Sequence, residues 1–172
     1  MQNSTNMRIL ELLRSLYERT DENHPATVSD IIAHLNGKGI QAVRQTVYAD
    51  TNALIDAGID IVVVKSTQNQ YFMGNRLFEY PELKMLTDAV ASSKIISANK
   101  SEELVQKLCR LTSLHQAKQL QKFAALSSRV KPHNEKVYYI IDNIQTAIGN
   151  HQQIRFQYYE YTQEKKKILK HD

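Results

Sequence analysis

The sequence contains few of the residues that cross-link or interrupt a chain: one cysteine, three prolines and five glycines among 172 residues, and no tryptophan. A single cysteine, Cys109, excludes an intrachain disulfide and is typical of a reducing compartment. The longest apolar run, residues 59–64, contains Asp60 and is too short to span a membrane. The N-terminus MQNSTNMR has no apolar segment of signal-peptide length. We therefore expect a cytoplasmic protein with a helix-rich globular composition.

Residues with catalytic or metal-binding chemistry form no motif. The six histidines show no pair at metal-binding spacing, and neither a glycine-rich phosphate loop nor a serine-centred elbow is present. Cys109 follows Leu108 in an apolar helical stripe, which predicts a buried residue rather than a nucleophile. We expect no catalytic residue, no metal and no cofactor, and therefore not an enzyme.

Charge is unevenly distributed along the chain. The formal net charge is +4, but residues 1–80 hold 7 Lys and Arg against 9 Asp and Glu, while residues 81–172 hold 15 against 9. The basic excess thus lies outside residues 41–73, which carry the strongest pattern of the chain. Net charge alone therefore does not indicate a nucleic-acid partner, and local placement of residues must decide.

The first 80 residues predict three helices followed by a β-hairpin. Apolar spacing predicts a helix over residues 6–18, with a stripe at Ile9, Leu10, Leu13, Leu16 and Tyr17. Thr27 and Asp30 have the spacing of a capping box for a second helix, which ends at residues 36–39. A third helix is predicted over residues 41–57, stopped by Gly58, and two strands over residues 59–65 and 70–74. This order is typical of a winged helix-turn-helix DNA-binding domain.

The third helix has two different faces. At 100° per residue, Val43, Val47 and Leu54 share a face expected to pack inward. Gln41, Arg44, Gln45, Tyr48 and Asn52 fall on the opposite side, and these types contact bases or phosphates, with Arg44 the strongest candidate for a base contact. Flanking residues expected near phosphates complete the predicted DNA-binding set: Thr27, Ser29, Lys38, Thr46 and Lys65. Because winged helices also serve as protein-interaction scaffolds and residues 1–80 are net acidic, a scaffold that does not bind DNA is the alternative.

The remaining residues predict further helices and a short hairpin. Residues 81–133 are interpreted as a helical linker and dimerisation region, with an apolar stripe through Leu83, Leu86, Ala89 and Val90. A linker is expected at residues 129–134 and a helix at 135–149. Strand-like alternation follows over residues 153–161, with a partner strand beginning at residues 168–169.

The segment RQTVYADTNALIDAGIDI resembles the recognition helix and first wing strand of WYL-domain transcriptional regulators, which have a DeoR-like N-terminal helix-turn-helix. The matching positions are Arg44, Thr46, Val47, Tyr48, Asp50, Leu54, Gly58 and Ile59. YFMGNRLFEYPELKMLTDAVASSKIIS and QTAIGNHQQIRFQYYEYTQEKKK resemble the linker region and the start of the WYL domain of this family. Two positions differ: Ala49 replaces a commonly basic residue, and Thr51 replaces a usual Ile or Leu.

The resemblance implies a mainly α protein: a winged helix-turn-helix over residues 1–80, a helical linker domain, and the first strands of a small β-barrel within residues 134–172. It implies a dimeric, sequence-specific regulator of transcription that binds double-stranded DNA. The resemblance also implies an effector of nucleotide or nucleic-acid type, which would bind a complete WYL domain. With at most two barrel strands, this chain is expected to lack most of that sensor.

Overall fold

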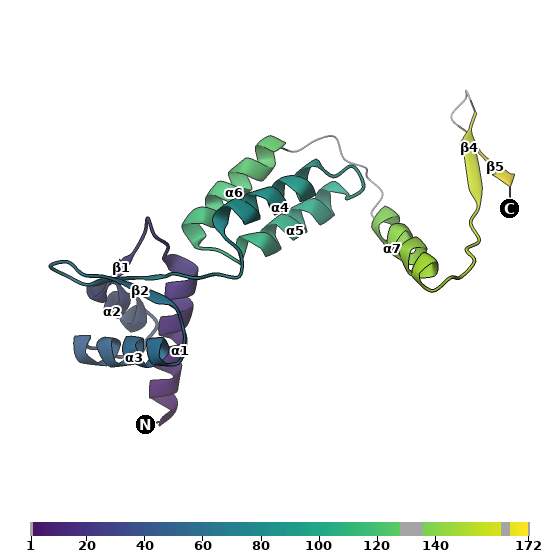
Figure 1. Ribbon diagram of the computed structural model, residues 1–172. Helices are drawn as coiled ribbons and strands as arrows, with labels where there is room; N and C mark the ends of the chain where they lie inside the picture. Colours follow the sequence, from purple (N-terminus) through teal and green to yellow (C-terminus); the bar gives the residue numbers. More distant parts are fainter. Residues whose placement is uncertain (1, 128–135, 163–165, 172) are drawn as a thin grey trace. The chain divides into compact units, whose positions relative to one another are not determined.

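The computed structural model describes residues 2–127, 136–162 and 166–171 (Figure 1). Within these ranges the protein is mainly helical, with seven helices, a three-stranded antiparallel sheet and a two-stranded hairpin. The chain divides into two compact units, one of residues 1–93 and 99–130 and the other of residues 94–98 and 131–172. The linker expected at residues 129–134 lies outside the described residues.

The first unit begins with what we call the N-terminal module, residues 2–77. It consists of α1 (Gln2–Arg19), β1 (Ala26–Thr27), α2 (Val28–Gly37), α3 (Arg44–Asp56), β2 (Ile61–Val64) and β3 (Gln70–Met73). The strands form an antiparallel sheet in the order β1-β3-β2, and Figure 1 shows the three helices gathered on one side of the β2–β3 hairpin. Their apolar side chains form one core, which includes Leu12, Leu16, Ile31, Leu35, Val47, Leu54, Ile61, Tyr71 and Met73.

The predicted start and end of α2 and the predicted end of α3 are confirmed. Thr27 is the N-cap of α2, and its hydroxyl and amide both bond Asp30 in a reciprocal capping box. Gly39 and Gly58 have positive φ values of 75° and 89°, which lets the chain reverse after α2 and α3. The hairpin strands also lie within the two segments predicted for them, residues 59–65 and 70–74.

Two predictions about packing are wrong. Leu10 is 62% exposed, and Leu12, which the expected stripe omitted, is fully buried. Val43 is 61% exposed because α3 starts at Arg44 rather than at residue 41, which leaves Val43 outside the helix as its N-cap. The inward face of α3 therefore consists of Val47, Thr51 and Leu54 together with Asp50.

The same unit continues with α4 (Tyr80–Ser92), α5 (Ala98–Cys109) and α6 (Leu114–Ser127). These helices have their own core of Leu83, Val105, Cys109, Ala117 and Leu120. Burial raises the pKa of the Cys109 thiol, consistent with its predicted role as a core residue. Of the stripe predicted on α4, Leu83 is buried and Val90 half-buried, but Leu86 and Ala89 are exposed.

A polar junction joins the N-terminal module to α6. The Asp21 carboxylate, in the turn after α1, accepts hydrogen bonds from the Ser113 hydroxyl, the Asn23 amide and the His24 ring. Ser113 also accepts the Gln116 amide at 3.1 Å, so it caps α6. The His24 ring stacks on His115 of α6 with 3.8 Å between ring centroids. Both Asp21 and Ser113 are almost completely buried.

The linker that leaves β3 is also held against α1. The Arg76 guanidinium donates to the carbonyls of Tyr17 and Thr20 at 2.6 and 2.8 Å and lies over the Tyr17 ring. The Thr20 hydroxyl accepts the Met73 amide at 3.1 Å. The end of α1 is therefore bonded to both β3 and the segment that leads into α4.

The second unit contains α7 (Lys136–Gly149) and an antiparallel hairpin of β4 (Tyr158–Tyr161) and β5 (Lys167–His171). The helix agrees with the one expected over residues 135–149, whereas the first strand starts at Tyr158 rather than at residue 153. Many of the described apolar side chains here are exposed, including Ile140, Ile144, Ile148, Phe156 and Ile168.

Among the described residues, no helix combines the length and the apolar character that crossing a bilayer requires.

The Asp21 junction gives a stability prediction. Burial raises the pKa of the Asp21 carboxyl, but the hydrogen bonds from Ser113, His24 and Asn23 outweigh burial and hold the pKa below its ordinary 3.8. The junction therefore stabilises the fold at pH values above the ordinary pKa of 3.8, and this stabilisation is lost as the pH falls through the lower pKa of the folded state. Ser113→Ala should lower the free energy of unfolding at neutral pH by roughly 1–3 kcal/mol. It should also move acid unfolding to higher pH.

Urea unfolding followed by circular dichroism at several pH values would measure both effects. Ser29→Ala removes an exposed serine hydroxyl and should change neither quantity. Equal acid midpoints for Ser113→Ala and the natural protein would show that the junction does not depress the Asp21 pKa.

Candidate nucleic-acid interface

One side of α3 is polar and exposed, and the other side is buried. Arg44, Gln45, Tyr48 and Asn52 lie within one third of the helix circumference, and all four are exposed. Within the described part of the chain, their side chains make no recorded hydrogen bond or ion pair. Their donors and acceptors are therefore available to an outside partner.

A local hydrogen-bond pattern determines where α3 begins. The Thr46 hydroxyl accepts the Val43 amide at 3.1 Å and donates to the Val43 carbonyl at 2.8 Å. Before it, the Asn36 side chain accepts the Ala42 amide at 3.2 Å. Gln41 is therefore exposed but lies in the turn before the helix, which corrects its predicted place on the polar face. Thr46 is half-buried, and its hydroxyl is already engaged in capping.

An ion pair that the sequence prediction missed fixes α3 against α1. Arg8 donates to the two carboxylate oxygens of Asp50 at 2.5 and 3.1 Å, and both side chains are largely buried. The hydrogen bond with Asp50 raises the pKa of Arg8. Beside this pair, the buried Thr51 hydroxyl donates to the Val47 carbonyl at 2.8 Å. The buried face of α3 thus has a single charged anchor between apolar contacts.

Strand pairing brings the start of α2 and the hairpin turn to one edge of the module. Thr27 pairs with Gln70, which pairs with Val64 on its other side. Lys65 follows Val64 directly and is exposed at the start of the turn. The hairpin also lies beside α3, since Tyr71 of β3 and Val47 of α3 belong to the same core.

The start of α2 is less suited to a phosphate than predicted. Hydrogen bonds from the Thr27 hydroxyl and amide lower the pKa of the Asp30 carboxyl, so an anion occupies this helix end. The Thr27 hydroxyl is engaged in this capping box, whereas Ser29 on the first turn is exposed. A phosphate at this end would meet the Asp30 carboxylate.

Ion pairs leave few free cations near α3. Arg8 binds Asp50, Arg14 binds Glu18 at 2.9 Å, and Lys38 lies 3.6 Å from Glu11. Lys38, at the C-cap of α2, is therefore partly neutralised. Among the described residues, Arg44 and Lys65 form no ion pair with an acidic side chain. These two residues supply the available positive charge of the predicted DNA-binding set.

No protein-family model matches the chain, and no curated protein is significantly similar to it. Within the described residues, no group of three or more His, Cys, Asp or Glu side chains could hold a metal ion.

The Arg8–Asp50 pair should determine how firmly α3 is held. Replacing Asp50 with Ala leaves a largely buried guanidinium without its carboxylate and should lower the free energy of unfolding by roughly 2 kcal/mol. Asp56→Ala removes an exposed acid from the same helix and should have little effect. Chemical denaturation of both variants would measure the difference. A loss for Asp50→Ala no larger than that for Asp56→Ala would show that the pair is not an anchor.

Proposed function

We propose that the N-terminal module is a winged helix-turn-helix that binds double-stranded DNA, with α3 in the major groove and the β2–β3 hairpin as the wing. The observation that carries this proposal is the exposed polar face of α3, whose side chains make no hydrogen bond or ion pair with other described residues. An α-helix fits the major groove of DNA, where the four base pairs differ in the donors and acceptors on their edges. Its buried opposite face and the Arg8–Asp50 pair would hold it rigidly for that contact.

The side chains on this face match distinct features of the groove. In the proposal, Arg44 at the first turn contacts the O6 and N7 acceptors of a guanine, and Gln45 or Asn52 contacts an adenine. The exposed Val43 beside Arg44 suits a thymine methyl group. Sequence reasoning missed Val43 because it placed the residue inside the helix. The available signal was Thr46, a hydroxyl residue three positions after an N-cap.

The hairpin contributes charge rather than base recognition. Lys65 stands at the start of the turn, where a wing would meet the phosphates that flank the major groove. Because Arg44 and Lys65 are the two available cations of the set, we expect few phosphate contacts per module and a modest dependence of affinity on salt.

A sequence-specific regulator of transcription is the function that this arrangement supports best. In the proposal, two copies place their α3 helices one turn of DNA apart on an inverted repeat, and an effector would act through residues beyond the N-terminal module. The second unit has one helix and a hairpin among its described residues, as the start of a WYL domain would. Absence of any binding to random duplex DNA at low salt would instead favour a protein-interaction scaffold.

Arg44→Ala should weaken binding to the best duplex selected from a random pool by about 5- to 150-fold, since one good bidentate base contact is worth roughly 1–3 kcal/mol. Fluorescence anisotropy at fixed salt would measure the change. Arg110→Ala removes the same charge from an exposed site after α5 and should change affinity little. Equal losses for the two variants would rule out a base contact by Arg44.

Lys65→Ala should weaken binding by a similar factor for selected and unselected duplexes, because a phosphate contact carries no direct sequence information. The slope of log affinity against log salt concentration should become less negative by about 0.9, the contribution of one phosphate. A titration over several salt concentrations would measure the slope. A sequence-dependent loss with an unchanged slope would contradict the role of Lys65.

A further inference from the structure

Two histidine rings stack where the N-terminal module meets α6. The ring of His24, in the turn after α1, lies parallel to the ring of His115 on the first turn of α6, with 3.8 Å between centroids and 4° between planes. Solvent reaches both residues, and the His24 side chain is 43% exposed. Imidazole is the side chain that ordinarily gains its charge between about pH 5 and 8. The contact can therefore change its charge without any unfolding.

The Asp21 carboxylate determines where a proton can be added to His24. Oδ1 of Asp21 lies 2.7 Å from Nδ1 of His24. Because hydrogen bonds hold the Asp21 pKa below its ordinary value, the carboxylate is ionised at neutral pH and can only accept. Nδ1 of His24 therefore carries the hydrogen of the neutral ring, and a further proton enters at Nε2. The bond to Asp21 persists in both charge states of the ring.

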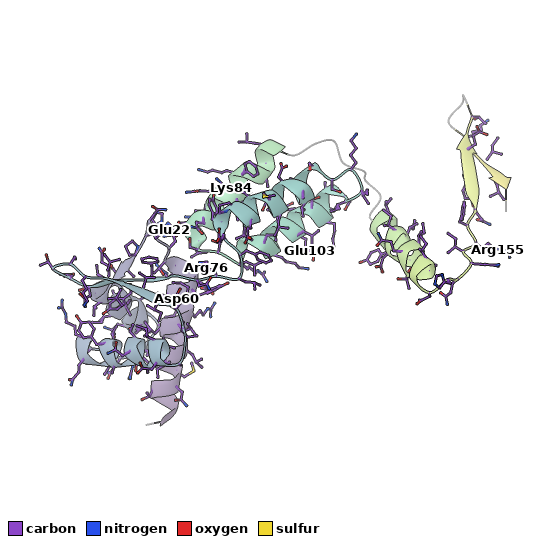
Figure 2. The ribbon with its side chains drawn as sticks, in the orientation of Figure 1. Glu22, Asp60, Arg76, Lys84, Glu103 and Arg155 are labelled. Carbon is purple, nitrogen blue, oxygen red and sulfur yellow. The ribbon has the colours of Figure 1, made fainter. Side chains whose placement is uncertain are left out.

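The charged groups beside the stack compensate one added proton but not two. Asp21 and Glu22 precede His24 in the same turn, and Arg76 of the linker interacts electrostatically with both acids. Figure 2 labels Glu22 and Arg76. Two carboxylates and one guanidinium give these groups a net charge of −1 while both rings are neutral. A first proton brings the cluster to neutrality, and a second makes it positive.

The side of the stack that belongs to α6 offers a second proton no compensation. The sequence of α6 contains no acidic residue. Gln116 donates to the Glu22 carboxylate at 3.3 Å, and Lys118, one residue short of a full turn after His115, adds a further positive charge. Two protonated rings about 4 Å apart repel each other, although exposure to solvent screens part of the repulsion. The doubly protonated stack is therefore the unfavourable state.

Separation of the rings would loosen the first turn of α6. The Ser113 hydroxyl accepts the Gln116 amide, and the Ser113 carbonyl accepts the Ala117 amide at 2.8 Å. The same hydroxyl bonds Asp21, so this turn is held to the N-terminal module by that bond and by the stack beside it. Loss of the stack leaves fewer contacts to keep the Gln116 and Ala117 amides protected.

We propose that the His24–His115 stack is a proton-sensitive contact that holds the first turn of α6 against the N-terminal module while at most one ring is charged, and releases it when both are. Release is expected between about pH 7 and pH 5, the ordinary range of imidazole. Asp21 itself takes up a proton only at lower pH, so the two effects occupy separate pH windows. This inference goes beyond DNA binding and does not require it.

Hydrogen exchange measured by NMR on the full chain tests the contact. After correction for the intrinsic pH dependence of exchange, protection of the Gln116 and Ala117 amides should fall about tenfold from pH 7.5 to pH 5, equivalent to 1.4 kcal/mol. Protection of the Val47 amide in α3 should not change, which separates local release from global unfolding.

Two substitutions of His115 give opposite expectations. His115→Phe keeps a ring that can stack but cannot be charged, so protection of the Gln116 and Ala117 amides should be the same at both pH values. His115→Lys places a permanent charge at the same exposed site and should lower their protection already at pH 7.5. Circular dichroism melts would verify that both variants keep the fold.

His151→Asn is the matched control, because it removes a histidine of the second unit at a positive φ that Asn tolerates. The pH response of α6 should survive this change. Constant protection in the natural protein, an equal fall at Val47, a response that persists in His115→Phe, or a response lost in His151→Asn would each overturn the proposal. None of these readouts involves DNA, so the contact and the proposed function can fail separately.

Discussion

The orientation of α3 depends on one buried ion pair, Arg8–Asp50, because Val47 and Leu54 on the same inward face are apolar and the Thr51 hydroxyl bonds a carbonyl of α3 itself. Dispersion and burial are non-directional, so Val47 and Leu54 fix the depth of the helix more than its rotation about its own axis. A two-point bond between a guanidinium and a carboxylate is directional and does fix it. The side chains proposed to contact DNA are therefore oriented by an ion pair on the opposite side of the helix.

Much of the N-terminal module could be predicted from local signals. Thr27 and Asp30 lie within four residues and form the capping box that determines the start of α2. Gly58 ends α3 because glycine readily adopts a positive φ. The hairpin was predicted because two β-prone runs and the polar turn between them are short-range features. In these places, local preference and tertiary structure agree.

The errors have two sources, local bonds that helical periodicity does not describe and contacts between residues far apart in the sequence. The start of α3 depends on Asn36 holding the Ala42 amide and on Thr46 capping Val43, and helical periodicity cannot detect either bond. Asp50 looked like one more polar residue of a helix, since its partner lies 42 positions earlier. Leu10 fits a buried stripe by spacing alone, and only the packing of α1 shows that its side of the helix is exposed.

The Asp21 carboxylate belongs at once to the turn after α1 and to the first turn of α6. Opening either side exposes the same anion and leaves the Ser113 hydroxyl without its acceptor. The N-terminal module and the α4–α6 helices consequently share part of their unfolding free energy, and separation of their two cores does not make them thermodynamically independent. Unfolding of the α4–α6 helices therefore also destabilises the end of α1. The polar face of α3 is built from other residues.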